Sequence, residues 1–249
     1  MNDAPLLEVA GAVATITLQR PYKANRLTPG DLATVYAHIA TVNAHEEVLV
    51  LRILAGGKHF CSGFDVGQIG DKLTVDFGTL VDALEQARPV TIAAIQGGIY
   101  GGAIDMALSC DFRIGVSGID MFNPAARLGL HYYATGLQRY VERMGVDVAK
   151  RLYLTAEKIG AAEMHRIGYL TNLVEPGELN TAVDQLTATL AGMAPLALLG
   201  MKKNLNRIAR GTADAADIAR DCDRARNSAD LQEGRAAFAE KRAPRFTGR

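Results

Sequence analysis

Two apolar, strand-like runs that each end in a glycine-rich loop constrain the fold more than any other feature of this sequence. Residues 48–54 (VLVLRIL) and 90–95 (VTIAAI) have the continuous hydrophobicity of strands that are buried on both faces. Helix-like residues 73–88 separate the two runs, and the loop at residues 97–102 (GGIYGG) leads into an apolar helix at residues 103–109. This alternation of strands and helices predicts an α/β fold in which most strands pair in parallel.

The remaining elements continue this pattern and then change to helices. We expect further strands at residues 13–18 and 112–116, and a helix that begins at Thr28-Pro29. Beyond about residue 145 only residues 170–175 read as a strand. The helices expected in that part of the chain lie at residues 149–154, 161–167, 179–193, 196–210 and 212–241.

A domain boundary is expected at Pro195. This proline follows a long amphipathic stretch and precedes a helical tail rich in lysine and arginine. We therefore predict a core domain at residues 1–194, which holds the ligand site, and a helical oligomerisation subdomain at residues 195–249.

The composition limits the class of partner. The chain has 27 lysines and arginines and 27 aspartates and glutamates, so no net charge attracts nucleic acid, and a small-molecule substrate is expected. Cys61, Cys110 and Cys222 are few and widely spaced, as in proteins with reduced thiols, which indicates the cytoplasm. No stretch reaches the roughly 18 apolar residues that span a bilayer, and no leader pattern opens the chain. We expect no membrane partner.

The glycine-rich loops expose backbone where chemistry can take place. Gly63-Phe64 and Gly101-Gly102 each follow an apolar strand, and a helix that starts at Gly102 leaves N–H groups unpaired. Paired N–H groups of this kind can stabilise a developing negative charge as an oxyanion hole, although ordinary turns have the same composition. The nucleotide motifs GxGxxG and GxxxxGK[ST], the zinc motif HExxH, paired CxxC and the nucleophile motif GxSxG are all absent. The sequence therefore predicts no bound metal and no tightly bound cofactor.

Four strings of residues resemble the crotonase (enoyl-CoA hydratase/isomerase) superfamily in the family's order. GGKHFCSGFDV is similar to the signature F-[CS]-[AS]-G-x-D, and IQGGIYGGAIDMALSCDFRIG to the signature NGxxxGGGxE with its apolar helix. RPYKANRLT resembles the early RPxKxNAL segment, and AFAEKRAPRF the terminal FxEKRxPxF. The resemblance spans nearly the whole chain and implies a crotonase-like spiral of repeated ββα units.

The resemblance also implies a substrate and a site. An acyl-CoA thioester would be bound with its carbonyl oxygen between the backbone N–H groups of Phe64 and Gly102, and coenzyme A would enter only as part of that substrate. Lys23 would lie near the CoA phosphates, and Phe238 and Lys241 would reach a CoA held by a neighbouring subunit of a homotrimer or hexamer. The same signature places four loop residues beside the ligand: Cys61, Ser62, Gly63 and Asp65.

The acids expected of a hydratase are altered in this sequence. Family hydratases use two glutamates, and their positions correspond here to Asp105, which keeps a shorter carboxylate, and to Ala125, which has none. Asp105 is the best acid–base candidate because the helix carries it beside the proposed oxyanion hole. His131 and Tyr132 are candidate proton donors or polar contacts, with packing as the alternative.

Three functions remain open from the sequence. Enoyl-CoA hydratase or isomerase chemistry with Asp105 is the principal expectation. A decarboxylase of a malonyl-type CoA thioester is the first alternative, because loss of carbon dioxide forms the enolate without a base and so tolerates Ala125. That alternative would use Tyr132. A non-catalytic relative that binds CoA esters is the second alternative.

Overall fold

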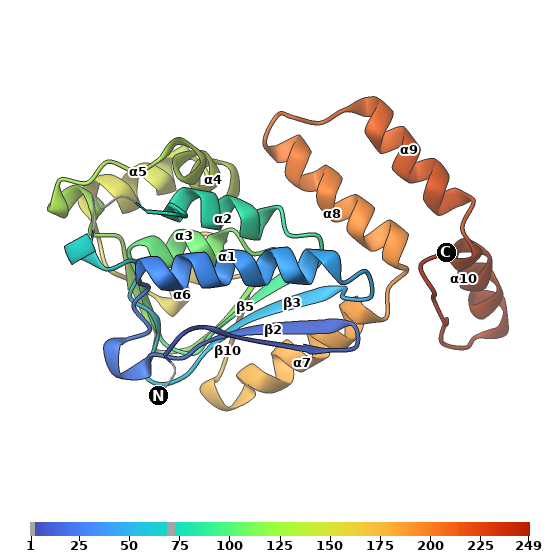
Figure 1. Ribbon diagram of the computed structural model, residues 1–249, viewed down its shortest axis with the longest axis horizontal. Coiled ribbons are helices and arrows are strands. Elements are labelled where there is room, and N and C mark those ends of the chain that lie inside the picture. The colour runs from blue at the N-terminus through green and yellow to red at the C-terminus, as the bar shows by residue number, and fades with distance from the viewer. Residues whose placement is uncertain (1–2, 69–72) are drawn as a thin grey trace.

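The computed structural model of the protein, shown in Figure 1, describes residues 3–68 and 73–249. Its strands form two sheets, a six-stranded sheet of order β1-β2-β3-β5-β7-β10 and a four-stranded sheet of order β4-β6-β8-β9. The strands are β1 (Leu6–Ala10), β2 (Val13–Leu18), β3 (Val50–Ala55), β4 (His59–Cys61), β5 (Val90–Ile95), β6 (Gly98–Tyr100), β7 (Phe112–Val116), β8 (Asp120–Phe122), β9 (Ile159–Gly160) and β10 (Asn172–Val174).

From β3 to β8, consecutive strands alternate between the two sheets. β3, β5 and β7 lie in the larger sheet, and the strands that follow them, β4, β6 and β8, lie side by side in the smaller one. A helical segment follows each of these pairs. All neighbouring strands are parallel except β1 with β2 and β8 with β9. The expected α/β fold with mainly parallel pairing is confirmed.

Helices cover both faces of the larger sheet (Figure 1). α7 packs against β3, β5 and β7, whereas α1 packs against β2 and α2. The α-helices are α1 (Pro29–Ala44), α2 (Phe77–Glu85), α3 (Gly102–Leu108), α4 (Ala134–Met144), α5 (Val146–Thr155), α6 (Ala161–Arg166), α7 (Leu179–Ala191), α8 (Pro195–Ala209), α9 (Ala215–Arg226) and α10 (Ala229–Glu240). Short 3-10 turns lie at Pro21–Lys23, Val66–Gln68, Ala125–Leu128 and Pro176–Glu178.

Local signals place the start of α1 where the sequence predicts it. The Thr28 side chain accepts a hydrogen bond from the Asp31 N–H, and the Asp31 carboxylate accepts one from the Thr28 N–H. This reciprocal cap satisfies two N–H groups that the first turn leaves unpaired. Pro29 occupies the first turn, where its missing N–H costs nothing.

Other elements differ from their predictions because tertiary contacts decide them. Residues 59–61 and 98–100, expected as parts of loops, form β4 and β6, which pair with each other. β1, β8, β9 and α4 are not predicted at all. The long helix expected at residues 212–241 is two helices. α9 ends at Arg226 with Asn227 as its C-cap, and the Ser228 side chain caps α10 by accepting a bond from the Leu231 N–H.

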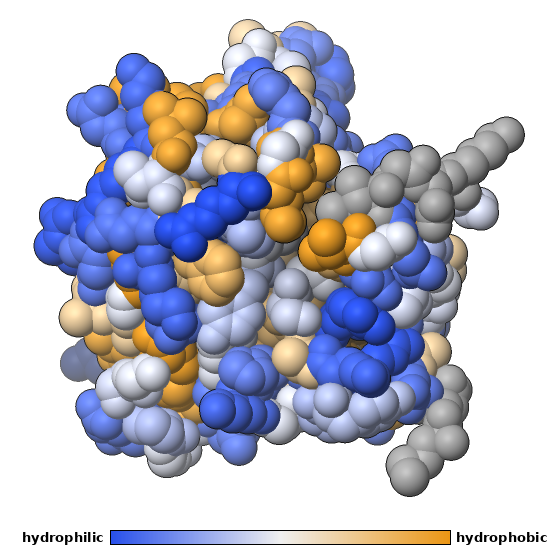
Figure 2. Space-filling model, turned by 90° about the vertical axis from the view of Figure 1, so that its left-hand side faces the viewer, coloured by the Kyte–Doolittle hydropathy of each residue, from blue (hydrophilic) through white to orange (hydrophobic). Residues whose placement is uncertain are grey.

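The C-terminal helices extend from one side of the molecule. α8 begins at Pro195, the expected boundary, and α9 and α10 lead away from the sheets (Figure 1). Among residues 3–68 and 73–249, no single helix has the length and apolar character needed to cross a membrane, and Pro176–Ala191 with Pro195–Ala209 meet that test only as a pair bent by 109°. On the face seen in Figure 2, hydrophobic side chains are interspersed with hydrophilic ones.

Candidate active site

The first glycine-rich loop is held by backbone bonds to the segment that follows β2. The Leu27 N–H donates to the Gly63 carbonyl and the Asp65 N–H donates to the Leu27 carbonyl, both at 2.9 Å. These two bonds form a parallel bridge between Leu27 and Phe64, and neither uses the Phe64 N–H. The loop therefore keeps this N–H outside its own backbone ladder.

Asn25 holds the same loop in place through its side chain and its backbone carbonyl. Its side-chain amide donates to the carbonyls of Gly56 and His59 at 2.9 Å, and its own carbonyl accepts a bond from the Cys61 thiol at 3.0 Å. Asn25 is 1% exposed and has a left-handed φ of 51°. Within the RPYKANRLT segment, buried Asn25 thus holds the loop in place, a role that the sequence alone did not reveal.

The second glycine-rich loop touches the first. Gly63 has φ of +88°, and a Cβ atom there would lie 2.8 Å from the Tyr100 carbonyl oxygen and 3.0 Å from the Gly102 nitrogen. Gly101, with φ of 55° and ψ of −130°, turns the chain into α3. Because Gly102 is the first residue of α3, its N–H lies outside the helical ladder. Only glycine at position 63 permits this close approach of the two loops.

Aromatic rings cover the junction of the loops. A Cβ atom on Gly102 would lie 2.7 Å from Cζ of Phe77, so the Phe77 ring lies directly against this glycine. The Phe77 ring centroid is 6.4 Å from that of Phe64 and 6.5 Å from that of Tyr133. Phe64, Phe77 and Tyr133 thus form a continuous row of rings, which we call the aromatic row.

Asp105 lies one turn into α3 and is buried. Both of its carboxylate oxygens are 2.8 Å from Nη1 of Arg139, and the Tyr133 hydroxyl donates a short hydrogen bond to Oδ2. Neither the Asp105 nor the Arg139 side chain is exposed. Burial raises the pKa of Asp105, while Arg139 and Tyr133 oppose this shift. Asp105 is therefore a buried carboxylate held by Arg139 and Tyr133.

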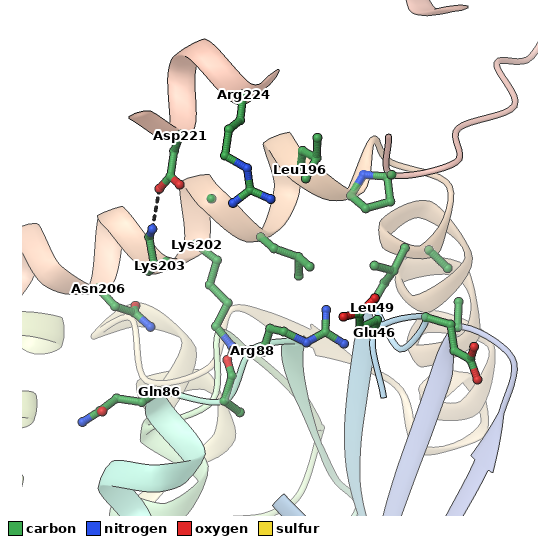
Figure 3. Close-up of a pocket in the computed structure, with 18 of the residues that line it drawn as sticks. Glu46, Leu49, Gln86, Arg88, Leu196, Lys202, Lys203, Asn206, Asp221 and Arg224 are labelled. Atoms are coloured by element: carbon green, nitrogen blue, oxygen red, sulfur yellow. Dashed lines mark hydrogen bonds and ion pairs between the residues drawn. The ribbon is translucent and has the colours of Figure 1, made fainter. Parts of the chain in front are cut away.

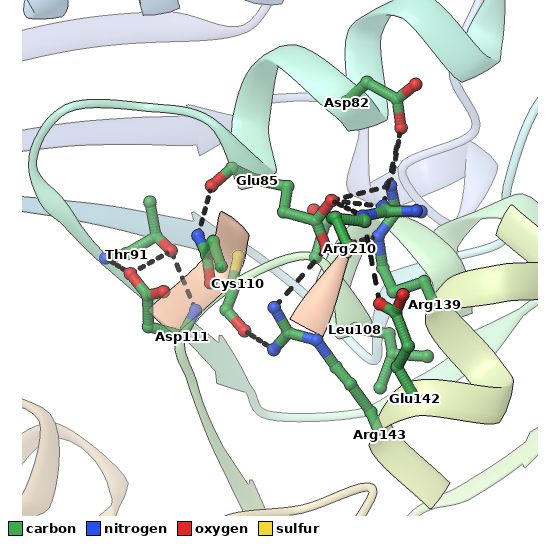
Figure 4. Close-up of polar contacts among 12 residues, drawn as sticks. Asp82, Glu85, Thr91, Leu108, Cys110, Asp111, Arg139, Glu142, Arg143 and Arg210 are labelled. Carbon is green, nitrogen blue, oxygen red and sulfur yellow. Dashed lines mark hydrogen bonds and ion pairs between the residues drawn. The ribbon is translucent and has the colours of Figure 1, made fainter. Parts of the chain in front are cut away.

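Arg139 is also the centre of a buried charge network (Figure 4). Its Nε donates to Glu85 at 2.9 Å and its Nη2 to Asp82 at 2.6 Å. Arg210, which follows the last residue of α8, binds the same Glu85 carboxylate. Burial raises the pKa of Glu85, but Arg139 and Arg210 outweigh burial and hold that pKa below its usual range. The network connects the helix that carries Asp105 to the C-terminal part of the chain.

The other proposed acid–base residues do not touch Asp105 through a polar atom. The Tyr132 ring stacks on Tyr133 with centroids 5.0 Å apart, and within the described part of the chain its buried hydroxyl has no hydrogen-bond partner. His131 is exposed, and its Nδ1 lies 2.8 Å from the Tyr132 carbonyl oxygen. Ala125 is 5% exposed and begins a 3-10 turn. Tyr133, which the sequence reasoning passed over for Tyr132, is the tyrosine bonded to Asp105.

The proposed ligand-binding residues fall into two groups. In the first loop, the Cys61 thiol is buried, which raises its pKa to about 12, and it donates to the Asn25 carbonyl. Asp65 pairs with Arg26 at 3.3 Å. Both residues therefore support the loop itself. Ser62 also belongs to this loop, and its N–H donates to the Ala24 carbonyl at 2.9 Å.

The residues expected near CoA lie apart from one another. Lys23 is exposed at the end of a 3-10 turn that precedes Asn25. Phe238 is 88% exposed, and Lys241 ends α10 with a left-handed φ of 53°. Figure 1 shows α10 far from α3 within one chain. Phe238 and Lys241 therefore do not reach the two glycine loops of their own chain.

A cavity of about 1160 Å³ lies elsewhere, between α8 and the core (Figure 3). Its polar lining includes Arg88, Lys202, Lys203 and Arg224, and it does not include either glycine loop. Across the described residues, no cluster of three or more histidine, cysteine, aspartate or glutamate side chains could hold a metal ion.

Comparisons with known proteins identify the family. A family model described as enoyl-CoA hydratase/isomerase matches residues 8–249. The chain belongs to the enoyl-CoA hydratase/isomerase family. A short-chain-enoyl-CoA hydratase of Clostridium acetobutylicum is 33% identical over 210 residues, covering 81% of this chain and 80% of that protein. A crotonyl-CoA hydratase of Syntrophomonas wolfei is 30% identical and covers 97% of this chain and 96% of its own length.

A solved structure agrees with this family assignment. The crystal structure of an enoyl-CoA hydratase from Mycobacterium tuberculosis superposes on this enoyl-CoA hydratase/isomerase family member with a TM-score of 0.88. The two chains are 25% identical, and the match covers 100% of each. The crotonase-superfamily resemblance and the crotonase fold expected from the sequence are therefore confirmed.

The buried partners of Asp105 are what sequence reasoning missed in this family member. Tyr133 stands next to Tyr132, and no local pattern distinguishes the two. Arg139 and Glu85 lie on helical segments where charged residues are common, and nothing in their spacing reveals that both become buried. Only the packing of α2, α3 and α4 brings these side chains to one carboxylate.

Proposed function

We propose that this protein catalyses enolate-forming chemistry on an acyl-CoA thioester, as an enoyl-CoA hydratase or isomerase. The thioester carbonyl oxygen would accept hydrogen bonds from the backbone N–H groups of Phe64 and Gly102. The observation that carries this proposal is the close approach of the two glycine loops at Gly63 and Gly102. The backbone bonds that hold these loops do not use the N–H groups of Phe64 and Gly102. Preorganised donors of this kind stabilise an enolate oxygen as its charge develops, and removing one typically costs about 10²- to 10³-fold in kcat.

Asp105 is the acid–base group of this proposal. It lies three residues after Gly102 on the same helix, about one turn from the proposed donor. Burial raises its pKa, while Arg139 and Tyr133 oppose this shift. Lys23 would bind a CoA phosphate, and Phe238 and Lys241 would contact the CoA of a neighbouring subunit in a trimer or hexamer.

A decarboxylase of a malonyl-type CoA thioester is the second candidate. The observation that favours it is the apolar, buried Ala125 at the position of the second family acid, together with the full burial of Asp105. Loss of carbon dioxide forms the enolate directly, so this reaction needs the oxyanion hole but not a second carboxylate. This candidate would use Tyr132, whose ring stacks on that of Tyr133 beside Asp105.

A turnover screen by mass spectrometry separates these functions. The purified protein is incubated with crotonyl-CoA, a 3-enoyl-CoA, a dienoyl-CoA and methylmalonyl-CoA, and Asp105→Asn is run in parallel. Water addition or double-bond migration that the variant loses supports the hydratase or isomerase. Release of carbon dioxide from methylmalonyl-CoA supports the decarboxylase instead. Binding of all four thioesters without any turnover would contradict both.

A further inference from the structure

Asp105 offers no surface through which a substrate could reach it directly. Its side chain is 0% exposed, and both of its oxygens are engaged by Arg139. Gly136 of α4 covers it as well, because a Cβ atom there would lie 2.9 Å from Asp105 Oδ2. A proton that moves between Asp105 and a substrate must therefore pass through a neighbouring group.

Tyr133 is the neighbour that meets this requirement. Its hydroxyl donates to Asp105 Oδ2, and Tyr133 as a residue is partly exposed, whereas Asp105 and Arg139 are buried. Its ring belongs to the aromatic row, which passes through Phe77 to the proposed oxyanion donor Gly102. Tyr133 therefore joins the buried carboxylate to the wall that covers the two glycine loops.

We propose that Tyr133 exchanges the proton with the substrate and that Asp105 acts only through it. This inference rests on the proposed function. As the α C–H bond of the acyl group breaks, its electron pair enters the enolate and its proton forms a new O–H bond at Tyr133. The original O–H bond of Tyr133 breaks at the same time, and that proton binds Asp105 Oδ2. Asp105 changes from carboxylate to carboxylic acid, Tyr133 stays neutral, and reprotonation reverses each transfer.

The electrostatic surroundings favour a tyrosine that remains neutral. Burial raises the pKa of the Tyr133 hydroxyl far above its usual range, and the neighbouring Asp105 charge raises it further. A free phenolate beside that carboxylate would place two negative charges in a buried site. Arg139 faces both groups from α4, Glu85 faces Asp105 from α2, and Tyr132 faces Tyr133. A concerted relay forms no phenolate. Within the protein it changes only the charge of Asp105, the carboxylate that pairs with Arg139.

The test measures α-proton exchange separately from binding. Butyryl-CoA, which has no double bond to hydrate, is incubated with the protein in D₂O, and deuterium at its α-carbon is followed by mass spectrometry. Binding of butyryl-CoA is measured by calorimetry on the same samples. Tyr133→Phe removes the relay hydroxyl but keeps the ring. Tyr153→Phe is the matched control, because its buried hydroxyl has no hydrogen-bond partner in the described part of the chain and lies in the same ring cluster.

We expect Tyr133→Phe to slow exchange by about 100-fold or more, as loss of a positioned acid–base group does, with the Kd of butyryl-CoA changed by less than about threefold. Tyr153→Phe should exchange at the wild-type rate. Wild-type exchange together with an unaffected Tyr133→Phe overturns the relay and leaves the proposed function standing. A wild-type protein that exchanges no α-proton overturns the proposed function and the relay together. Thermal unfolding of each variant confirms that the protein used in the assay is folded.

Discussion

The Arg139 guanidinium contacts both carboxylate oxygens of Asp105 at 2.8 Å, and neither side chain is exposed to solvent. Asp82 and Glu85 bind the remaining nitrogens of the same guanidinium. One arginine thus contacts three carboxylates from two helices that pack beside it, and Arg210 shares the Glu85 carboxylate. A buried charge pair is costly to desolvate, so it persists only where its geometry and hydrogen bonds are nearly complete.

Arg139→Met should lower the free energy of unfolding by about 3–5 kcal/mol, because it leaves Asp105 and Glu85 buried without their main partner. Urea denaturation followed by circular dichroism measures this loss. Arg226→Met is the control, since that arginine is 71% exposed and pairs with Asp223 at the surface. If the two variants have equal free energies of unfolding, the buried network does not stabilise the fold as proposed.

Gly63→Ala should abolish thioester turnover, whereas Gly118→Ala should not. Both glycines have left-handed φ values, +88° and +81°, so both substitutions carry a similar backbone strain of about 1–2 kcal/mol. Only at Gly63 would the new Cβ collide with backbone, at 2.8 Å from the Tyr100 oxygen and 3.0 Å from the Gly102 nitrogen, while Gly118 has open space. Steady-state kinetics on the best substrate from the turnover screen compares the two variants. If Gly63→Ala and Gly118→Ala have comparable kcat values, the contact between the two glycine loops is not needed for turnover.

Lys202→Met should weaken the attachment of α8 to the core by about 3–5 kcal/mol. The Lys202 side chain is 8% exposed, and its ammonium pairs with Asp111 at 2.9 Å and donates to the Ala87 carbonyl at 2.7 Å. Its neighbour Lys203 is the control, because it is 38% exposed and binds Asp221 within the C-terminal helices, as Figure 3 shows. Surface pairs contribute only about 0–1 kcal/mol. Chemical denaturation should therefore show a much larger loss of unfolding free energy for Lys202→Met than for Lys203→Met.

The segment after α10 should detach in acid. The Glu233 carboxylate accepts bonds from the Arg242 side chain and, at 2.7 Å, from the Arg245 N–H, and these lower the pKa of Glu233 from its ordinary 4.5 to about 2. A folded pKa below the unfolded pKa means that the stabilisation is complete above about pH 4.5 and is lost as the pH falls towards 2.

Hydrogen exchange of the Arg245 amide measures this detachment. Its protection should fall across that pH window in the wild-type protein. In Glu233→Gln, whose amide does not titrate, the protection should show no such dependence. A wild-type amide that stays equally protected from pH 5 to pH 2 would contradict the assignment.

Patterns along the chain were sufficient to predict the α/β architecture. Residues 13–18, 90–95 and 112–116 form β2, β5 and β7 with the predicted bounds. These short runs are rich in β-branched and apolar residues, which favour strands buried in a sheet. The reciprocal cap at Thr28 placed the start of α1 for a similarly local reason. The glycine loops could be recognised as exposed backbone because glycine is needed wherever chains approach closely.

Tertiary structure decided the state of the candidate site. Asp105 and Arg139 are separated by 34 positions, so no local pattern could show that one neutralises the other. The choice of Tyr133 over Tyr132 depends on which of two adjacent rings points towards α3, and β4 and β6 exist as strands because each pairs with the other. Hydrophobic periodicity and residue propensity report which face of each segment is buried and which is exposed. Ion pairs, strand register and access of protons to a side chain depend instead on which segments, distant in the sequence, pack together.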